Sequence, residues 1–520
     1  MSIKTTVSKF FAMIVIITMF WAIGTTIFLP KMNSIFSLFR ATQSLSVIKT
    51  INVVCLLFVL FLLFFYVRKI SKIKVELSNK KVYVILILEL VVYCLMLLFF
   101  YKWIGFINPV DDTRITLNIL EYLGEKGHLN YDYMYSNPQN LMLMYFFKSL
   151  QSIFGKNYQV LIFAFCIIHS LSILFIFWSL KNLKINNFIS LLTIQVLFFS
   201  AQLSLHVGVA YTDILAIFFV SVALFFLTKF FRLNVNLDSN SRSFCYLFLS
   251  LILVSIGYLS KGTVLIVALA LSVGFFFIFT GFKKLICFLP LLFLLVGNFG
   301  WNHFIQSQHI FPDNNYGQPN THYLMMGLSG TGDIKSLSSE NIYTWIPGAY
   351  SGADQELTWK LFLDRKISKK QISQQHFEII KKRLKNLNGW NMLCFLNNKV
   401  AVTWSTGDLK STYELKLGVD ESSNRLNLLS NNYSGAILYM LMTIVQYLIY
   451  IGIILAAILC FKNYNSFIFI SNIFISGYFF FLLLWEASPR YSMLIFPFGI
   501  LMIGYFLKSS SEGVKNKKIK

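Results

Sequence analysis

Residues 435–461 read GAILYMLMTIVQYLIYIGIILAAILCF, a run without a charged side chain. A helix of about 20 apolar residues crosses the roughly 30 Å of hydrocarbon in a bilayer, so this run is long enough to span a membrane. Comparable runs predict about twelve such helices, at residues 10–29, 48–67, 82–104, 159–180, 186–205, 209–228, 244–259, 262–280, 285–301, 435–461, 465–484 and 491–507. The sequence therefore predicts an all-α polytopic membrane protein.

The composition supports this fold class. The chain has 520 residues, of which 56% are hydrophobic and 13% are charged, and it holds more apolar surface than a water-soluble core of this length can hide. The formal net charge of +23 would suggest a nucleic-acid binder in a soluble protein. Here the basic residues fall in the short loops between spans, as the positive-inside rule describes.

The basic loops predict the orientation of the chain in the plasma membrane. Counting every span places both termini in the cytoplasm, and residues 105–158 and 302–434 on the extracytoplasmic face. One mildly basic loop, with Lys31, Arg40 and Lys49, falls outside in this count but is outweighed by seven basic inner segments. The first span is too long for a removed signal peptide and lacks its cleavage pattern, so we expect an anchor.

This orientation divides the chain into six segments. They are N-terminal spans (1–104), a first extracytoplasmic loop (105–158), central spans (159–301), an extracytoplasmic segment of mixed structure and domain size (302–434), C-terminal spans (435–507) and a basic cytoplasmic tail (508–520). In the first loop, Leu117, Leu120 and Leu123 predict an amphipathic helix over 112–123. The apolar run 141–154 is too short for a clear span and predicts an interfacial or re-entrant helix.

The sequence carries no nucleotide-binding loop, dinucleotide fingerprint or zinc-protease motif, and its seven cysteines form no disulfide or metal-ligand pattern. We therefore expect no cofactor, although a divalent metal near paired acids stays open. The energy for any reaction must then reside in the substrate.

An adjacent acid pair, Asp111 and Asp112, begins the 112–123 helix, with Arg114 two residues further on. Either carboxylate by itself is as readily explained as a helix N-cap. Two adjacent acids at the predicted membrane face are harder to explain in this way. The helix dipole keeps a carboxylate ionised, whereas a like-charged neighbour disfavours ionisation, so one member of the pair is a candidate base.

Further polar residues fall at the same predicted face. Tyr211 and Asp213 begin a span, where an N-cap is the alternative, and Lys261 links two spans, where it can bind phosphate or extend to lipid headgroups. Glu486, Arg490 and Tyr491 lie in the short link before the last span. We expect Glu486 and Arg490 to pair, and Arg490 offers the best fork for a phosphate.

This order of features resembles the GT-C glycosyltransferases. The shared pattern comprises many spans, an Asp-Asp pair in the first long outer loop, Tyr-Thr-Asp at residues 211–213 and Glu-Ala-Ser-Pro-Arg-Tyr at 486–491. The outer segment adds His322-Tyr-Leu-Met-Met-Gly-Leu, Gly-Ala-Tyr-Ser-Gly-Ala-Asp at 348–354 and Thr-Trp404-Ser-Thr-Gly. The chain looks closest to the branch found in low-GC Gram-positive bacteria.

The resemblance implies a membrane enzyme that transfers a sugar from a polyprenyl-phosphate donor to a hydroxyl of a cell-envelope glycan or teichoic acid. It places an acidic catalyst at Asp111 or Asp112. A phosphate leaving group needs cations rather than an acid, and the candidates are Arg490, Lys261 and Arg114. A direct displacement would invert the anomeric configuration. The remaining candidates for substrate binding are Tyr211, Asp213, His322, Trp404, Glu486 and Tyr491.

Aromatic side chains of the outer segment can stack on sugar rings or form its core, and Tyr343, Trp345, Tyr350 and Trp404 are the candidates. Other function classes also fit the span number. A flippase or transporter of lipid-linked sugars would carry ionisable groups at mid-depth, whereas the acids noted here gather at one surface. A polysaccharide polymerase and a non-catalytic scaffold remain alternatives.

Overall fold

The computed structural model describes residues 3–30, 37–69, 77–126, 132–233, 241–311, 313, 315–331, 346–363, 367–420, 423–430 and 433–517. Within these ranges the chain is helical, and no β-strand occurs apart from two isolated bridges. Helices satisfy their own backbone hydrogen bonds, which a membrane-embedded segment requires. The predicted all-α fold class is confirmed.

Ten helices in the described ranges are long and apolar enough to span a membrane. They are α1 (Ile3–Phe28), α3 (Leu45–Arg68), α4 (Asn79–Ile104), α8 (Tyr158–Asn182), α11 (Thr212–Leu233), α12 (Ser241–Ser260), α14 (Leu289–Ser307) with the preceding 3₁₀ turn η5 (Gly281–Phe288), α21 (Tyr433–Leu459), α22 (Ser466–Leu484) and α23 (Phe496–Lys517) with η8 (Pro489–Ile495).

Two of the twelve expected spans take another form. The segment expected at 186–205 is a pair of helices, α9 (Asn187–Phe198) and α10 (Ala201–Val207), bent by 59°. Counting that pair as one span raises the number in the described ranges to eleven. The segment expected at 262–280 is a shorter apolar helix, Gly262–Ile278, formed by η4 (Gly262–Val264) and α13 (Leu265–Ile278).

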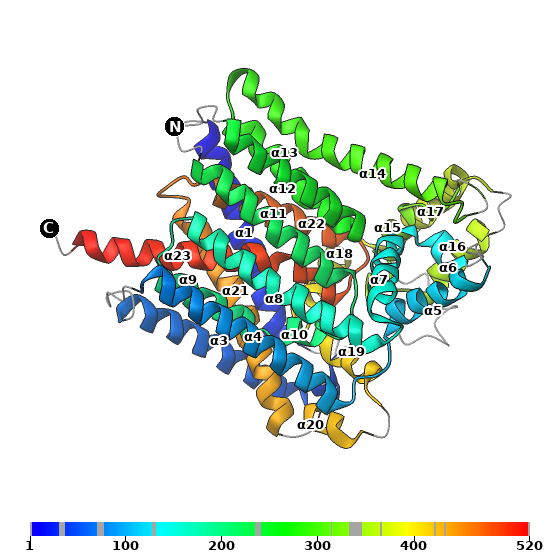
Figure 1. The fold of residues 1–520 in the computed structure, drawn as a ribbon, viewed down its shortest axis with the longest axis horizontal. Helices are drawn as coiled ribbons and strands as arrows, with labels where there is room; N and C mark the ends of the chain where they lie inside the picture. Colours follow the sequence, from blue (N-terminus) through cyan, green and yellow to red (C-terminus); the bar gives the residue numbers. More distant parts are fainter. Residues whose placement is uncertain are drawn as a thin grey trace.

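The helices between the spans gather at one end of the bundle. Figure 1 shows both chain termini at the left end, whereas several helices from the two long connecting segments lie at the right end. These are α5 (Asp111–Lys126), α6 (Asp132–Ser136), η3 (Pro138–Asn140), α7 (Leu141–Phe154), α15 (Thr321–Met326), α16 (Gly352–Leu363) and α17 (Lys369–Asn386). Residues from segments 105–158 and 302–434 therefore meet in space.

Part of segment 302–434 enters the bundle. Helix α18 (Gly389–Trp404) packs against α1, α22 and η8, and α19 (Ser411–Gly418) packs against α10. Three short helices complete the described elements: α2 (Leu38–Thr42), η7 (Asn424–Leu426) and α20 (Asn427–Ser430). The described part of this segment is thus built onto the spans rather than set apart from them.

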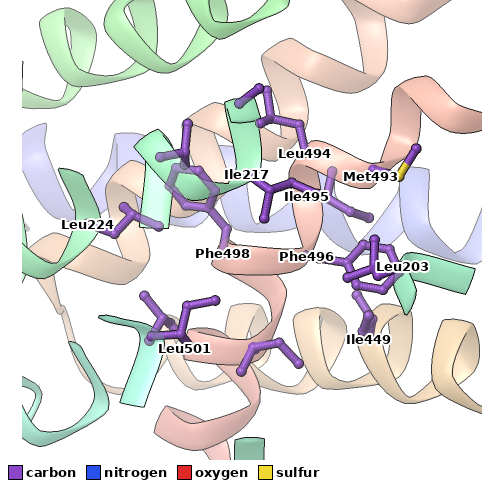
Figure 2. Close-up of a cluster of buried hydrophobic side chains, with 14 of the residues drawn as sticks. Leu203, Ile217, Leu224, Ile449, Met493, Leu494, Ile495, Phe496, Phe498 and Leu501 are labelled. Atoms are coloured by element: carbon purple, nitrogen blue, oxygen red, sulfur yellow. The ribbon is translucent and has the colours of Figure 1, made fainter. Parts of the chain in front are cut away.

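Apolar side chains from distant helices fill the bundle interior. Figure 2 shows Leu203 of α10, Ile217 of α11, Ile449 of α21 and Phe496 of α23 in one buried cluster. Lipid is as apolar as these side chains, so close packing rather than exclusion from water holds such helices together. An acid lies within the span α4: Glu89 accepts two hydrogen bonds of 3.2 Å from the amide of Gln195 on α9.

Candidate active site

The acid pair occupies the first residues of α5. Gly105 ends α4 in a left-handed conformation, and the amides of Ile107 and Asn108 both donate to the carbonyl of Gly418 at 3.0 Å. Asp111 itself has a φ of 43°, which is uncommon for a residue with a side chain. The short connection from α4 to α5 is therefore fixed against the end of α19, which places both carboxylates beside that helix.

Asp112 is held by a chain of hydrogen bonds. The Tyr133 hydroxyl donates to Asp112 Oδ1 at 2.7 Å and accepts from the Asn140 amide at 2.7 Å, and Tyr211 donates to Asn140 Oδ1 at 3.1 Å. Burial, together with the neighbouring Asp112 carboxylate, raises the pKa of Tyr133 and Tyr211 well above the ordinary value. Both hydroxyls therefore stay protonated and act as donors.

Arg490 lies between two acids from different segments. Its Nη2 is 3.7 Å from Asp112 Oδ2, and its Nη1 is 3.3 Å from Glu414 Oε1 on α19. The guanidinium also lies over the Tyr211 ring, 5.0 Å from the centroid. The expected pair between Arg490 and Glu486 does not form, because Arg490 binds the buried Glu414 instead.

Lys410 is the second cation beside the acid pair. Its Nζ is 3.3 Å from Asp111 Oδ2 and 3.4 Å from Glu414 Oε1. Glu414 also binds His206 of α10, with 2.8 Å between Oε2 and Nδ1. Burial alone would favour the neutral acid, but His206, Lys410 and Arg490 hold the pKa of Glu414 well below its usual range. The ionised Glu414 thus joins α10, α19 and η8.

The other expected cations do not contact the acid pair. Lys261 forms a buried ion pair with Asp213, and its Nζ also lies over the Tyr491 ring, 5.1 Å from the centroid. Burial lowers the pKa of Lys261, with Asp213 opposing that effect. Arg114 is exposed on α5 and has no contact with the acid pair among those found.

Glu486 is buried in the link before η8. Burial raises its pKa to about 7, which Arg490 opposes and Asp112 reinforces. Lys399 fixes the preceding residue, because its Nζ donates to the carbonyls of Trp485 at 2.7 Å and Gly327 at 2.6 Å. Tyr323 stacks on Trp485 with 5.0 Å between ring centroids. Among the described residues Glu486 forms no ion pair, although Arg490, Lys410 and Lys399 each act to lower its pKa.

Two expected substrate-binding residues are enclosed in the structure. His322 is fully buried, with its ring nitrogens 2.8 Å from the Thr358 hydroxyl and 3.0 Å from Gln355 Oε1. Trp404 is also fully buried and packs against Tyr450 and Phe479. Neither side chain reaches the acid pair. Of the remaining aromatic candidates, Tyr350 is exposed, and Tyr343 and Trp345 lie outside the described residues.

Lys410 and Glu414 were not singled out from the sequence. Their spacing of four residues on a helix is a signal for an ion pair, but it is common in surface helices. Tyr133 and Asn140 lacked any signal, since single polar residues in a loop are unremarkable. Among the residues that the structure describes, no three His, Cys, Asp or Glu side chains gather as they would around one metal ion.

Comparison with known proteins adds one match. Residues 137–300 match the family model of dolichyl-phosphate-mannose-protein mannosyltransferases, which covers less than half of the chain. That family belongs to the GT-C superfamily, so the predicted resemblance is confirmed, while the low-GC Gram-positive branch stays a prediction. No curated protein and no solved structure matches the chain. The match supports a membrane glycosyltransferase that uses a lipid-linked sugar.

Proposed function

We propose that this GT-C-type glycosyltransferase moves a sugar from a polyprenyl-phosphate donor to a hydroxyl of a cell-envelope glycan or teichoic acid on the extracytoplasmic face. The observation that carries this proposal is the meeting of two partly exposed carboxylates, Asp111 and Asp112, with the cations Lys410 and Arg490. A base and cations are the two requirements of sugar transfer from a phosphate.

We assign the base to Asp111. Its side chain is 38% exposed and has a single ion-pair contact, at 3.3 Å, whereas Asp112 accepts from Tyr133 and also lies near Arg490. A base needs a free oxygen within hydrogen-bond reach of the acceptor hydroxyl. Asp112 then orients Arg490, and Arg490 binds the donor phosphate.

A single displacement accounts for the reaction. The acceptor oxygen attacks the anomeric carbon while Asp111 takes its proton, and the bond to the phosphate oxygen breaks with its electron pair left on the phosphate. The product lipid phosphate carries one more negative charge than the donor, which Arg490 stabilises. This path inverts the anomeric configuration, so the product linkage should be opposite to that of the donor.

A direct assay tests the proposal. Purified protein is incubated with synthetic polyprenyl-phosphate sugars and with envelope polymers from cells that lack the protein, and released polyprenyl phosphate is measured. We expect acceptor-dependent release that Asp111→Asn lowers by about 10² or more. The absence of release with every sugar and every polymer would overturn the assignment as an enzyme of this kind.

The orientation needs its own test. Cysteines introduced at Asn157 and Gln374 should react with a membrane-impermeant reagent in intact cells, in a background without the native cysteines, whereas one at Lys81 should not. All three positions are exposed in the structure. Protection of both outer positions would place the acid pair in the cytoplasm and would contradict the proposed mechanism.

A further inference from the structure

Glu414 brings two cations to one oxygen atom. Its Oε1 is 3.4 Å from Lys410 Nζ and 3.3 Å from Arg490 Nη1, and its side chain is only 1% exposed. Lys410 and Arg490 repel each other, so they stay this close only while the buried carboxylate lies between them. Each cation also retains some exposure, at 14%, and faces the acid pair.

His206 is a third side chain that contacts the Glu414 carboxylate. Its Nδ1 is 2.8 Å from the Glu414 carboxylate, and its Nε2 is 2.9 Å from the carbonyl of Leu409. A carboxylate and a carbonyl both accept hydrogen bonds, so both ring nitrogens of His206 face acceptors. Lys410 and Arg490 share the one carboxylate of Glu414, which can neutralise only one of their two charges.

The turn that carries Lys410 is held in an unfavourable conformation. Leu409 and Lys410 have φ values of 53° and 71°, a region that residues with side chains rarely adopt. Asp408 braces the turn by accepting a 2.6 Å hydrogen bond from Thr412. Strained backbone that the surroundings enforce is concentrated at functional sites.

The strain is concentrated around the acid pair. Six residues other than glycine have positive φ in the described part of the chain, and four of them, Asp111, Ala210, Leu409 and Lys410, lie at this site. Ala210 precedes Tyr211, and the Thr113 hydroxyl next to the acid pair donates to the carbonyl of Val209 at 2.8 Å. Three separate segments are therefore held in strained conformations where they meet.

Lys261 offers a contrast within the same region. It pairs with one acid, Asp213, and both side chains are largely buried. A lysine that is neutralised by its own partner has little charge to offer to a ligand. Lys410 instead shares Glu414 with Arg490 and makes a contact of 3.3 Å with Asp111.

We propose that Lys410 is the second cation for the donor phosphate, and that Glu414 is the positioning residue that holds Lys410 and Arg490 together for it. This inference rests on the proposed function and identifies a phosphate-binding residue of the same site. As the bond from the anomeric carbon to phosphate breaks, the electron pair passes to the phosphate oxygen, and the two cations stabilise the added charge.

The same geometry places a bound donor beside the base. The Lys410 ammonium lies 3.3 Å from Asp111 Oδ2, so a phosphate that binds Lys410 brings its sugar next to that carboxylate.

Binding of the leaving lipid tests the inference without requiring the acceptor. Purified full-length protein in detergent is titrated with a C55 polyprenyl monophosphate, and with the uncharged C55 polyprenol as a control for the tail. Lys410→Gln should weaken binding of the phosphate by about tenfold to a hundredfold, the usual worth of a hydrogen bond to a charged group. Binding of the polyprenol should not change.

Two variants serve as matched controls. Lys416→Gln removes an exposed lysine from α19, the helix that begins directly after Lys410, and it should bind the phosphate as the wild type does. Lys261→Gln should weaken binding less than threefold, since it removes a charge that Asp213 already neutralises. Glu414→Gln should resemble Lys410→Gln for the phosphate and the wild type for the polyprenol, which a purely structural role would not produce.

The outcomes separate this inference from the proposed function. If the wild type does not bind the phosphate, both the proposed function and the role of Lys410 are contradicted. If the wild type and Lys410→Gln bind the polyprenyl monophosphate equally well, only the role of Lys410 is contradicted. Lys410→Arg keeps the charge and should retain most of the affinity. Loss of folded protein in both Lys410 variants would mark a stabilising residue and would overturn the proposal.

Discussion

Two charged clusters lie at the same end of the bundle and differ in how their charges are matched. The first cluster is the ion pair between Asp354 of α16 and Arg383 of α17. These two side chains form two hydrogen bonds of 2.8 Å, and Arg383 also donates to the Met325 carbonyl at 2.6 Å. In the site cluster around Glu414, each ion pair that reaches the acid pair is 3.3 Å or longer.

The two clusters also differ in exposure. Both side chains of the Asp354–Arg383 pair are buried, with 3% of Arg383 and 6% of Asp354 exposed. The side chains of Asp111 and Asp112 are 38% and 30% exposed. One acid matched to one arginine in a bidentate geometry stabilises a fold. Cations that share one acid and face open carboxylates can still bind a ligand. Both clusters consist of carboxylates and basic side chains. They differ in whether each cation has an acid of its own or shares one with another cation.

The largest expected effect is on folding. Asp354→Ala leaves Arg383 buried and unpaired, which should lower the free energy of unfolding by about 3–5 kcal/mol. Thermal or chemical unfolding of the purified protein would measure it. The control is Glu356→Ala on the same helix, because Glu356 forms an exposed pair with Lys360. If Glu356→Ala and Asp354→Ala lowered the free energy of unfolding equally, the Asp354–Arg383 pair would not be a stabilising pair.

The acid pair should respond in activity rather than in folding. Asp111→Asn should lower turnover by about 10² or more, because an amide keeps the shape of the side chain but cannot take a proton. Asp112→Asn should be milder, since Asn can still accept from Tyr133. Initial rates of polyprenyl phosphate release would compare the two. Two active variants in folded protein would end the claim that the pair is catalytic.

Arg490 should show the importance of geometry at the phosphate. Arg490→Ala should weaken use of the donor by about tenfold to a hundredfold, the worth of a hydrogen bond to a charged group. Arg490→Lys should restore only part of this, because an ammonium cannot reproduce the guanidinium fork. The Michaelis constant for the donor and the yield of folded protein must be measured together. A loss of yield at unchanged donor affinity would make the contact with Glu414 structural.

The smallest expected effect concerns Glu486 and pH. Its pKa is raised to about 7 in the folded protein, so between pH 4.5 and 7 the unfolded chain loses this proton first. The free energy of unfolding therefore falls as the pH rises through that window. Glu486→Gln should be more stable than the wild type at pH 8, by an amount on the order of 1 kcal/mol, and equally stable below pH 4.5. A difference that did not change with pH would point to packing.

Much of the site could be predicted from the sequence. Asp111, Asp112 and Arg490 were candidates, and the structure brings Arg490 within 3.7 Å of Asp112 although 378 positions separate them. These residues were chosen from the order of the motifs along the chain and from the prediction that all of them lie at the same face of the membrane. The Glu486 to Arg490 pair was expected from proximity in the chain, and it did not form because Glu414 offers a closer acid from another segment.

The sequence by itself determined the helical fold and its number of apolar runs, because the length of an uncharged run and the cost of an unpaired backbone group in lipid are local properties. Only the tertiary structure decided which charges meet. No proline or glycine in α9 or α10 predicts the bend between them, yet this bend brings His206 into contact with Glu414. The partners of Lys410, Glu414 and Arg490 depend on how α10, α19 and η8 pack, and packing sums many weak contacts that no local pattern records.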